Sequence, residues 1–188
     1  MSGPTARAVV IGASAGALEA LSILLPALPA TFRLPVIVVV HIPADTRNRL
    51  AEIFRTKCAV DVREAEDKEP LVPGTVFFAP PDYHLLVETD ERLSLNTDEP
   101  VLYSRPSIDV LFESAADVYG ASLIGIMLSG ANEDGARGLS AIVKAGGAAI
   151  IQNPDEAFAS TMPRAAMAAC PSARVLSLDA IADHLQEV

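Results

Sequence analysis

The sequence predicts an α/β protein: a doubly wound, mostly parallel sheet with helices on both faces and an antiparallel hairpin insertion. Short, largely apolar runs that contain β-branched residues recur at 8–11, 36–40, 121–128 and 148–151. Such runs are typical of strands that are buried on both faces. Segments with apolar residues three and four positions apart separate them, as in amphipathic helices. Strands that alternate with helices favour right-handed βαβ units and hence a parallel sheet.

The pattern in the N-terminal third of the chain predicts one βαβ unit followed by a further helix. The strand at 8–11 ends at Gly12, and the strand at 36–40 follows Pro35. A helix between them is predicted by four leucines at helical spacing: Leu18, Leu21, Leu25 and Leu28. A second helix is expected over about 46–57, with Asp45 as its N-cap and Leu50, Ile53 and Phe54 facing inward.

The middle of the chain predicts shorter strands and the hairpin insertion. Val60 and Val62 alternate with polar residues, and a turn at Pro73-Gly74 precedes a strand at 75–78. The runs 85–87 and 93–95, separated by Asp90-Glu91, predict the antiparallel hairpin. Residues 96–104 are expected to form an irregular connection.

The C-terminal half returns to alternating helices and buried strands. Apolar residues on one face predict a helix over 108–119, and the strand at 121–128 leads into a glycine-rich loop and a short helix. The strand at 148–151 ends at Asn153-Pro154. A short strand at 175–176 and a last helix from about Asp179 complete the predicted elements.

The composition of the chain excludes several classes of protein. The 188 residues are 51% apolar and are expected to form one domain, residues 1–188, with a self-sufficient core. Acidic residues outnumber basic ones by 24 to 14, which argues against nucleic-acid partners. No apolar stretch is long enough to cross a bilayer, and no signal peptide is evident. Cys58 and Cys170 match no metal or redox spacing, so buried free thiols and a cytoplasmic location are expected.

The segment Gly12-Ala13-Ser14-Ala15-Gly16 lies between a predicted strand and a predicted helix. It has the G-x-S-x-G arrangement of a nucleophile elbow, which exposes Ser14 at a helix N-terminus. The N–H group of Ala15 would then help to stabilise an oxyanion. Two other interpretations stay open at this point: a small-residue turn, and a dinucleotide-binding loop with Ser14 where the second glycine should stand.

His41 follows the second predicted strand directly, so it should lie beside Ser14 at the carboxyl edge of the sheet. An adjacent imidazole is what a serine hydroxyl needs to become a nucleophile. The alternative is a histidine that only bridges loop backbone. A carboxylate to orient His41 is expected in the loop after the strand at 121–128, where both Glu133 and Asp134 are candidates.

Six stretches of the chain resemble the catalytic domain of the CheB-type protein-glutamate methylesterases. They are VVIGASAGALEAL (9–21), VVVHIP (38–43), LVPGTVFFAPPDYHLLVE (71–88), RPSIDVLFESAA (105–116), LSGANEDGARGL (128–139) and QNPDEAFASTMPRAA (152–166). The resemblance implies that Ser14 is the nucleophile, His41 the general base and Asp134 the orienting acid. It also implies a second oxyanion N–H group from the loop that carries Ala131, and no cofactor.

The resemblance further implies a serine hydrolase that demethylates glutamyl methyl esters, and deamidates glutamines, on a methylated chemoreceptor or related signalling protein. The chain departs from the family pattern at Ala15, which is usually threonine, and within Gly130–Gly135, usually G-M-G-x-D-G. Few residues precede the first strand, so we expect no receiver domain in this chain. Three alternatives then stay open: the domain is constitutively active, it is a piece of a longer polypeptide, or a partner controls it. A separate response regulator or a fused methyltransferase or kinase module is the kind of partner expected. The alternative function is a non-catalytic signalling or binding module with the same fold.

Overall fold

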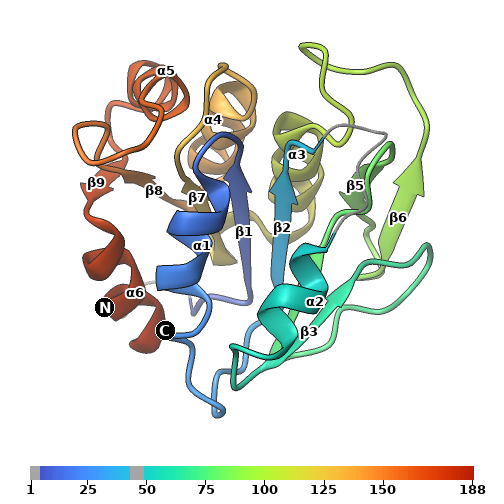
Figure 1. Ribbon diagram of the computed structural model, residues 1–188. Coiled ribbons are helices and arrows are strands. Elements are labelled where there is room, and N and C mark those ends of the chain that lie inside the picture. The colour runs from blue at the N-terminus through green and yellow to red at the C-terminus, as the bar shows by residue number, and fades with distance from the viewer. Residues whose placement is uncertain (1–4, 43–48) are drawn as a thin grey trace.

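A computed structural model describes residues 5–42 and 49–188 and confirms the predicted fold class. Seven parallel strands form one sheet in the order β3-β4-β2-β1-β7-β8-β9, and an antiparallel hairpin forms a second, two-stranded sheet (Figure 1). The strands of the large sheet are β1 (Ala8–Ala13), β2 (Val36–Val40), β3 (Asp61–Glu64), β4 (Thr75–Phe78), β7 (Leu123–Met127), β8 (Ala148–Gln152) and β9 (Arg174–Leu176). The hairpin consists of β5 (His84–Val87) and β6 (Leu93–Asn96).

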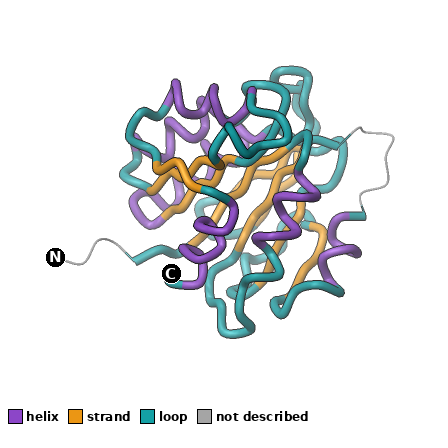
Figure 2. The backbone as a smooth tube through the Cα atoms, turned by 60° about the vertical axis from the view of Figure 1, so that its left-hand side comes forward, coloured by secondary structure: helices purple, strands orange, loops and turns teal. Residues whose placement is uncertain are grey.

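Helices cover both faces of the large sheet, as Figure 2 shows from the side. One face carries α1 (Ala17–Leu24), α2 (Leu50–Arg55) and α6 (Leu178–Gln186). The other carries α3 (Ile108–Tyr119), α4 (Ala136–Lys144), α5 (Thr161–Ala169) and the hairpin. None of the helices in the described part of the chain combines the length and the apolar character needed to cross a membrane.

The sheet is buried on both faces because successive side chains of a strand point to opposite sides. Val9 and Ile11 pack in the hydrophobic cluster beneath α1, whereas Ala8 and Val10 pack in the cluster beneath α3. All six residues of β1 are buried. This two-sided burial explains the continuous apolar runs from which the strands were predicted.

The structure differs from the sequence-based expectations in four places. Helix α1 ends at Leu24 and buries Ala17, Ala20, Leu21 and Leu24, so Leu18 faces outward and is 49% exposed. Helix α2 begins at Leu50, and the expected N-cap Asp45 and residues 46–48 lie outside the described residues. A 3-10 turn over Gly120–Ser122 shortens the strand expected at 121–128. Helix α5 was not predicted.

The two cysteines are free, as expected. Cys170 is buried in the α3-side cluster, whereas Cys58 is only partly buried. Burial nevertheless raises the pKa of the Cys58 thiol to about 11. The reactive thiolate is therefore scarce at neutral pH.

Helices α3 and α4 pack closely through Gly138. A Cβ atom added at Gly138 would lie 2.6 Å from Cβ of Phe112 and 3.1 Å from the backbone of Asp109. Both helices begin near the carboxyl edge of the sheet. The distance between α3 and α4 therefore sets the position of the loop that joins β7 to α4.

We expect Gly138→Ala to lower the free energy of unfolding by about 1–3 kcal/mol, because the new methyl group would force α3 and α4 apart. Urea unfolding followed by circular dichroism measures the change. Lys144→Ala, at an exposed position of the same helix, is the matched control and should change stability by less than about 0.5 kcal/mol. Equal stability of Gly138→Ala and the wild type would contradict this account of the packing.

Candidate active site

Three of the residues singled out in the sequence come together at the carboxyl edge of the large sheet. Ser14 directly follows β1, His41 directly follows β2, and Asp134 lies in the loop between β7 and α4. Ala13 pairs with Val40 in the sheet, and the His41 N–H donates to the Ala13 carbonyl over 3.1 Å. Strand β1 lies between β2 and β7, where the direction of winding reverses. Ligands of doubly wound sheets bind at such a point.

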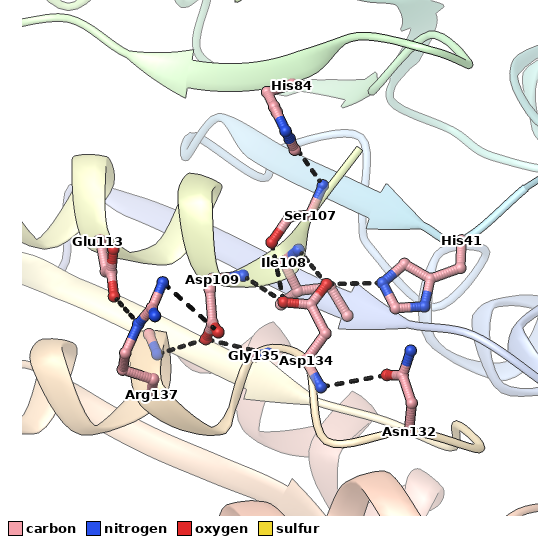
Figure 3. Close-up of polar contacts among 11 residues, drawn as sticks. His41, His84, Ser107, Ile108, Asp109, Glu113, Asn132, Asp134, Gly135 and Arg137 are labelled. Carbon is pink, nitrogen blue, oxygen red and sulfur yellow. Dashed lines mark hydrogen bonds and ion pairs between the residues drawn. The ribbon is translucent and has the colours of Figure 1, made fainter. Parts of the chain in front are cut away.

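His41 and Asp134 are directly hydrogen-bonded: the Nε2–Oδ2 distance is 2.7 Å (Figure 3). An ionised carboxylate only accepts hydrogen bonds, so Nε2 of His41 must carry the proton. Nδ1 of the neutral ring is then an acceptor, and it lies on the side of the ring away from Asp134. Within the described residues, no hydrogen bond joins the Ser14 hydroxyl to the His41 ring.

Asp134 is fully buried, yet four donors surround its carboxylate. Besides His41, these donors are the Ser107 hydroxyl (2.8 Å), the Ile108 N–H (2.7 Å) and the Asp109 N–H (3.0 Å). Because these N–H groups belong to the first turn of α3, Asp134 caps that helix from another part of the chain. Burial alone would raise the pKa of Asp134, but the hydrogen bonds from His41, Asp109 and Ile108 lower it below its ordinary value.

Asp109, on α3, caps the N-terminus of helix α4 in the same way. Its Oδ1 accepts the N–H groups of Gly135 (3.0 Å) and Gly138 (2.7 Å), which open α4. Arg137 lies 3.8 Å from Oδ2 of Asp109 and donates to Glu113 over 2.6 Å. Burial raises the pKa of Asp109, and the Asp134 charge adds to the rise. The two carboxylates thus fix the loop after β7 against the start of α3.

His84 is hydrogen-bonded to the backbone through both of its ring nitrogens, which indicates a structural role. The Ser107 N–H donates to Nδ1 of His84 over 3.1 Å, so Nε2 carries the proton and donates to the Glu99 carbonyl over 3.0 Å. Arg105 is also engaged within the protein, because its guanidinium donates to Asp82 and to two backbone carbonyls. Both side chains hold the segment that leads into α3.

The turn that carries Ser14 is fixed by Ser129. The Ser14 N–H donates to the Ser129 carbonyl over 2.9 Å, and the Ser129 hydroxyl donates to the Ala15 carbonyl over 2.6 Å. Gly16 closes the turn at φ +85°, a conformation that L side chains rarely adopt. No acceptor within the described residues takes the N–H group of Ala15 or of Ala131.

Two cavities flank this edge of the sheet. One, of about 540 Å³, adjoins Ser14 and is lined by apolar side chains that include Leu18, Ile53 and Phe158. The other, of about 380 Å³, adjoins His41. Within the described residues, no group of three or more His, Cys, Asp or Glu side chains is arranged to hold a metal ion.

Of the two acids that the sequence left open, only Asp134 joins His41, whereas Glu133 is exposed. Sequence reasoning missed the roles of Asp109 and Ser129 altogether. An acidic residue in the first turn of a helix, as Asp109 is, was an available signal, since such residues favour helix N-termini. Nothing in the sequence indicated that the N-terminus it serves belongs to another helix.

The pKa of Asp134 leads to a prediction about acid stability. A carboxyl group with a lowered pKa in the folded state stabilises the protein above its unfolded-state pKa of about 3.9. That stabilisation is lost as the pH falls through the folded-state pKa. Asp134→Asn should lower the free energy of unfolding by about 3 kcal/mol at pH 7, because buried donors lose their charged acceptor.

The difference between wild type and Asp134→Asn should shrink below about pH 4. Urea unfolding at a series of pH values measures it. Asp117→Asn, at an exposed position of α3, is the control and should differ from the wild type by less than about 0.5 kcal/mol. A difference that stays constant down to pH 2 would contradict a lowered pKa.

Comparison with known proteins gives the family of this chain. A Leptospira interrogans protein, provisionally named protein-glutamate methylesterase/protein-glutamine glutaminase, is 47% identical over 94% of this chain and 92% of its own length. The Symbiobacterium thermophilum protein-glutamate methylesterase/protein-glutamine glutaminase is 37% identical over 95% of this chain, but this covers only 49% of that protein.

The crystal structure of the Thermotoga maritima CheB methylesterase catalytic domain superposes with a TM-score of 0.93. The match covers 98% of this chain and 99% of that domain at 29% sequence identity. The family model for the CheB methylesterase matches residues 9–185. The chain therefore belongs to the CheB methylesterase family.

Proposed function

We propose that this chain is a serine hydrolase that demethylates γ-glutamyl methyl esters on chemoreceptors or related signalling proteins. The observation that carries the proposal is the hydrogen bond between His41 and Asp134, at the edge where Ser14 follows the adjoining strand β1. The names of the relatives supply the reaction class and its protein substrate. Those names also pair the esterase with a glutaminase, so we include deamidation of glutamine in the proposal.

In the proposed mechanism Ser14 Oγ attacks the ester carbonyl carbon while its proton passes to Nδ1 of His41. Asp134 holds the ring in the tautomer that has Nδ1 free, and its charge stabilises the imidazolium that forms. The C–O bond to the methoxy group then breaks, and the leaving oxygen takes the proton from His41 to give methanol. Water attacks the acyl-enzyme by the same route, releasing the glutamate carboxylate and restoring Ser14.

The negative oxygen of the tetrahedral intermediate needs N–H donors, which we assign to Ala15 and Ala131. Neither N–H group has an acceptor among the described residues, so both are available to the substrate without the loss of a hydrogen bond seen there. The absence of a Ser14–His41 hydrogen bond is compatible with catalysis, because such contacts tighten when substrate binds. The lowered pKa of Asp134 supports its role, since the acid must stay ionised when His41 becomes positively charged.

Ser14→Ala should reduce methanol release from a methylated chemoreceptor by about 10³-fold or more, because it removes the hydroxyl that would form the acyl-enzyme. His41→Ala should cost a similar factor, and the double variant little more than either single one, since the residues act as a unit. Release of tritiated methanol from the receptor measures these rates. Ser22→Ala on α1, which lines neither cavity flanking the edge, is the matched control.

A serine-directed fluorophosphonate separates the enzyme from a non-catalytic binding module. The enzyme should form an adduct on Ser14 that mass spectrometry locates, and His41→Ala should slow its formation. A fully folded wild-type protein that forms no adduct and releases no methanol would overturn the proposed function.

A further inference from the structure

The connection between β6 and α3 contains a tight turn with an unusual backbone. Val101 and Ser104 exchange two hydrogen bonds, of 3.0 and 2.8 Å, and pair as an isolated antiparallel bridge. The two residues between them have positive φ angles, 48° at Leu102 and 64° at Tyr103. A two-residue loop with both φ angles positive has the backbone of a type I′ turn, for which Asn-Gly is the favoured sequence.

Leucine and tyrosine are poor choices for this turn. A residue with a Cβ atom in the left-handed region costs of order 1 kcal/mol or more, and here two stand in succession. Burial of the side chains does not offset the cost, because Leu102 is 43% exposed and Tyr103 is 102% exposed. Local rules broken without a gain in packing are expected at functional sites.

The turn stands beside the candidate active site. Tyr103 and His41 line the same cavity of about 380 Å³. Leu102 lines a third cavity, of about 570 Å³, together with Glu133 and Arg137. In Figure 1 the segment between β6 and α3 rises above the edge of the sheet toward which the β1 and β2 arrows point.

The base of the turn is held firmly. The Arg105 guanidinium donates to Asp82 over 2.6 Å and to the carbonyls of Thr97 and Asp98 over 3.0 and 3.1 Å. His84 donates to the Glu99 carbonyl on the same segment. A turn on a fixed base loses little backbone entropy when its side chains bind a partner.

We propose that Leu102 and Tyr103 are specificity residues that contact the protein substrate next to the reacting ester. Tyr103 packs against an apolar side chain that flanks the esterified glutamate, while the ester reaches Ser14 and His41. Exposed aromatic side chains beside a cavity supply a large contact area at low entropic cost. The inference rests on the proposed function and deepens it: the turn distinguishes a glutamyl ester within a protein from the same ester on a small molecule.

The test is the double variant Leu102→Asn/Tyr103→Gly, which installs the favoured turn sequence. Two substrates are compared: a chemoreceptor cytoplasmic fragment with tritiated glutamyl methyl esters, and the γ-methyl ester of N-acetylglutamate amide. We expect the melting temperature to rise or stay the same, because the strain is relieved. The ratio of kcat/KM for the receptor fragment to kcat/KM for the small ester should fall tenfold or more.

Tyr103→Phe keeps the aromatic ring and should retain most of that ratio, whereas Tyr103→Ser should lose it. Lys68→Gly is the matched control, because Lys68 also has a positive φ of 66° and lines neither cavity that the turn adjoins. It should leave the ratio within twofold of the wild type.

An unchanged ratio in the double variant would overturn the inference, and so would equal losses with both substrates, which would place the turn's effect on the chemical step. If the wild type hydrolyses neither ester, the proposed function fails, and the inference fails with it. Hydrolysis of both esters by the wild type with an unaltered ratio in the variant overturns the inference alone.

Discussion

Two buried carboxylates, Asp134 and Asp109, hold the carboxyl edge of the sheet in one arrangement. Each accepts N–H groups from the first turn of the helix to which the other is attached: Asp134 caps α3, and Asp109 caps α4. A charge buried in this way is tolerable only if donors satisfy it, and the N-terminus of a helix offers unpaired N–H groups with a favourable dipole. The exchange therefore stabilises the charge on Asp134 and fixes its position with the same hydrogen bonds. His41 is then oriented by a group that cannot move unless both helices move.

The topology explains why the three residues at this edge meet, although 120 positions separate Ser14 from Asp134. Chain winding starts at β1, proceeds outward through β2 on one side, and resumes through β7 on the other. Loops that follow β1, β2 and β7 are therefore neighbours at the carboxyl edge, whatever lies between them in sequence. The His41 ring uses Nε2 toward Asp134, which leaves Nδ1 as its acceptor. This reverses the use of the two nitrogens in the chymotrypsin arrangement, where Nδ1–H donates to the aspartate.

Sequence patterns anticipated the parts of the fold that depend on local periodicity, and they failed where distant contacts decide. Unbroken apolar runs such as 36–40 predicted strands that are buried on both faces. The positions of Ser14 and His41 directly after two such strands predicted that they lie at the same edge of the sheet. Leu18 was expected inside because it shares the spacing of Leu21, yet α1 turns Ala17 and Ala20 toward the sheet instead. Helix α5 was missed because its interior carries Pro163 and small residues, and its burial comes from Met162 and Ala166 packing into the α3-side cluster. The capping of α4 by Asp109 spans 26 residues in sequence and has no local signature.

Two features at this edge of the sheet are unfavourable by themselves: the buried charge of Asp134 and the strained turn at Leu102-Tyr103. Burial of the Asp134 carboxylate costs desolvation free energy, and the hydrogen bonds from four donors offset that cost. The backbone strain of the Leu102-Tyr103 turn also costs free energy. Packing does not offset it, because both side chains are exposed to solvent. Selection for stability alone would favour Asn-Gly in that turn, as it favours donors around Asp134. A strained turn that persists beside His41 is therefore best explained by what its side chains contact when a protein substrate is bound.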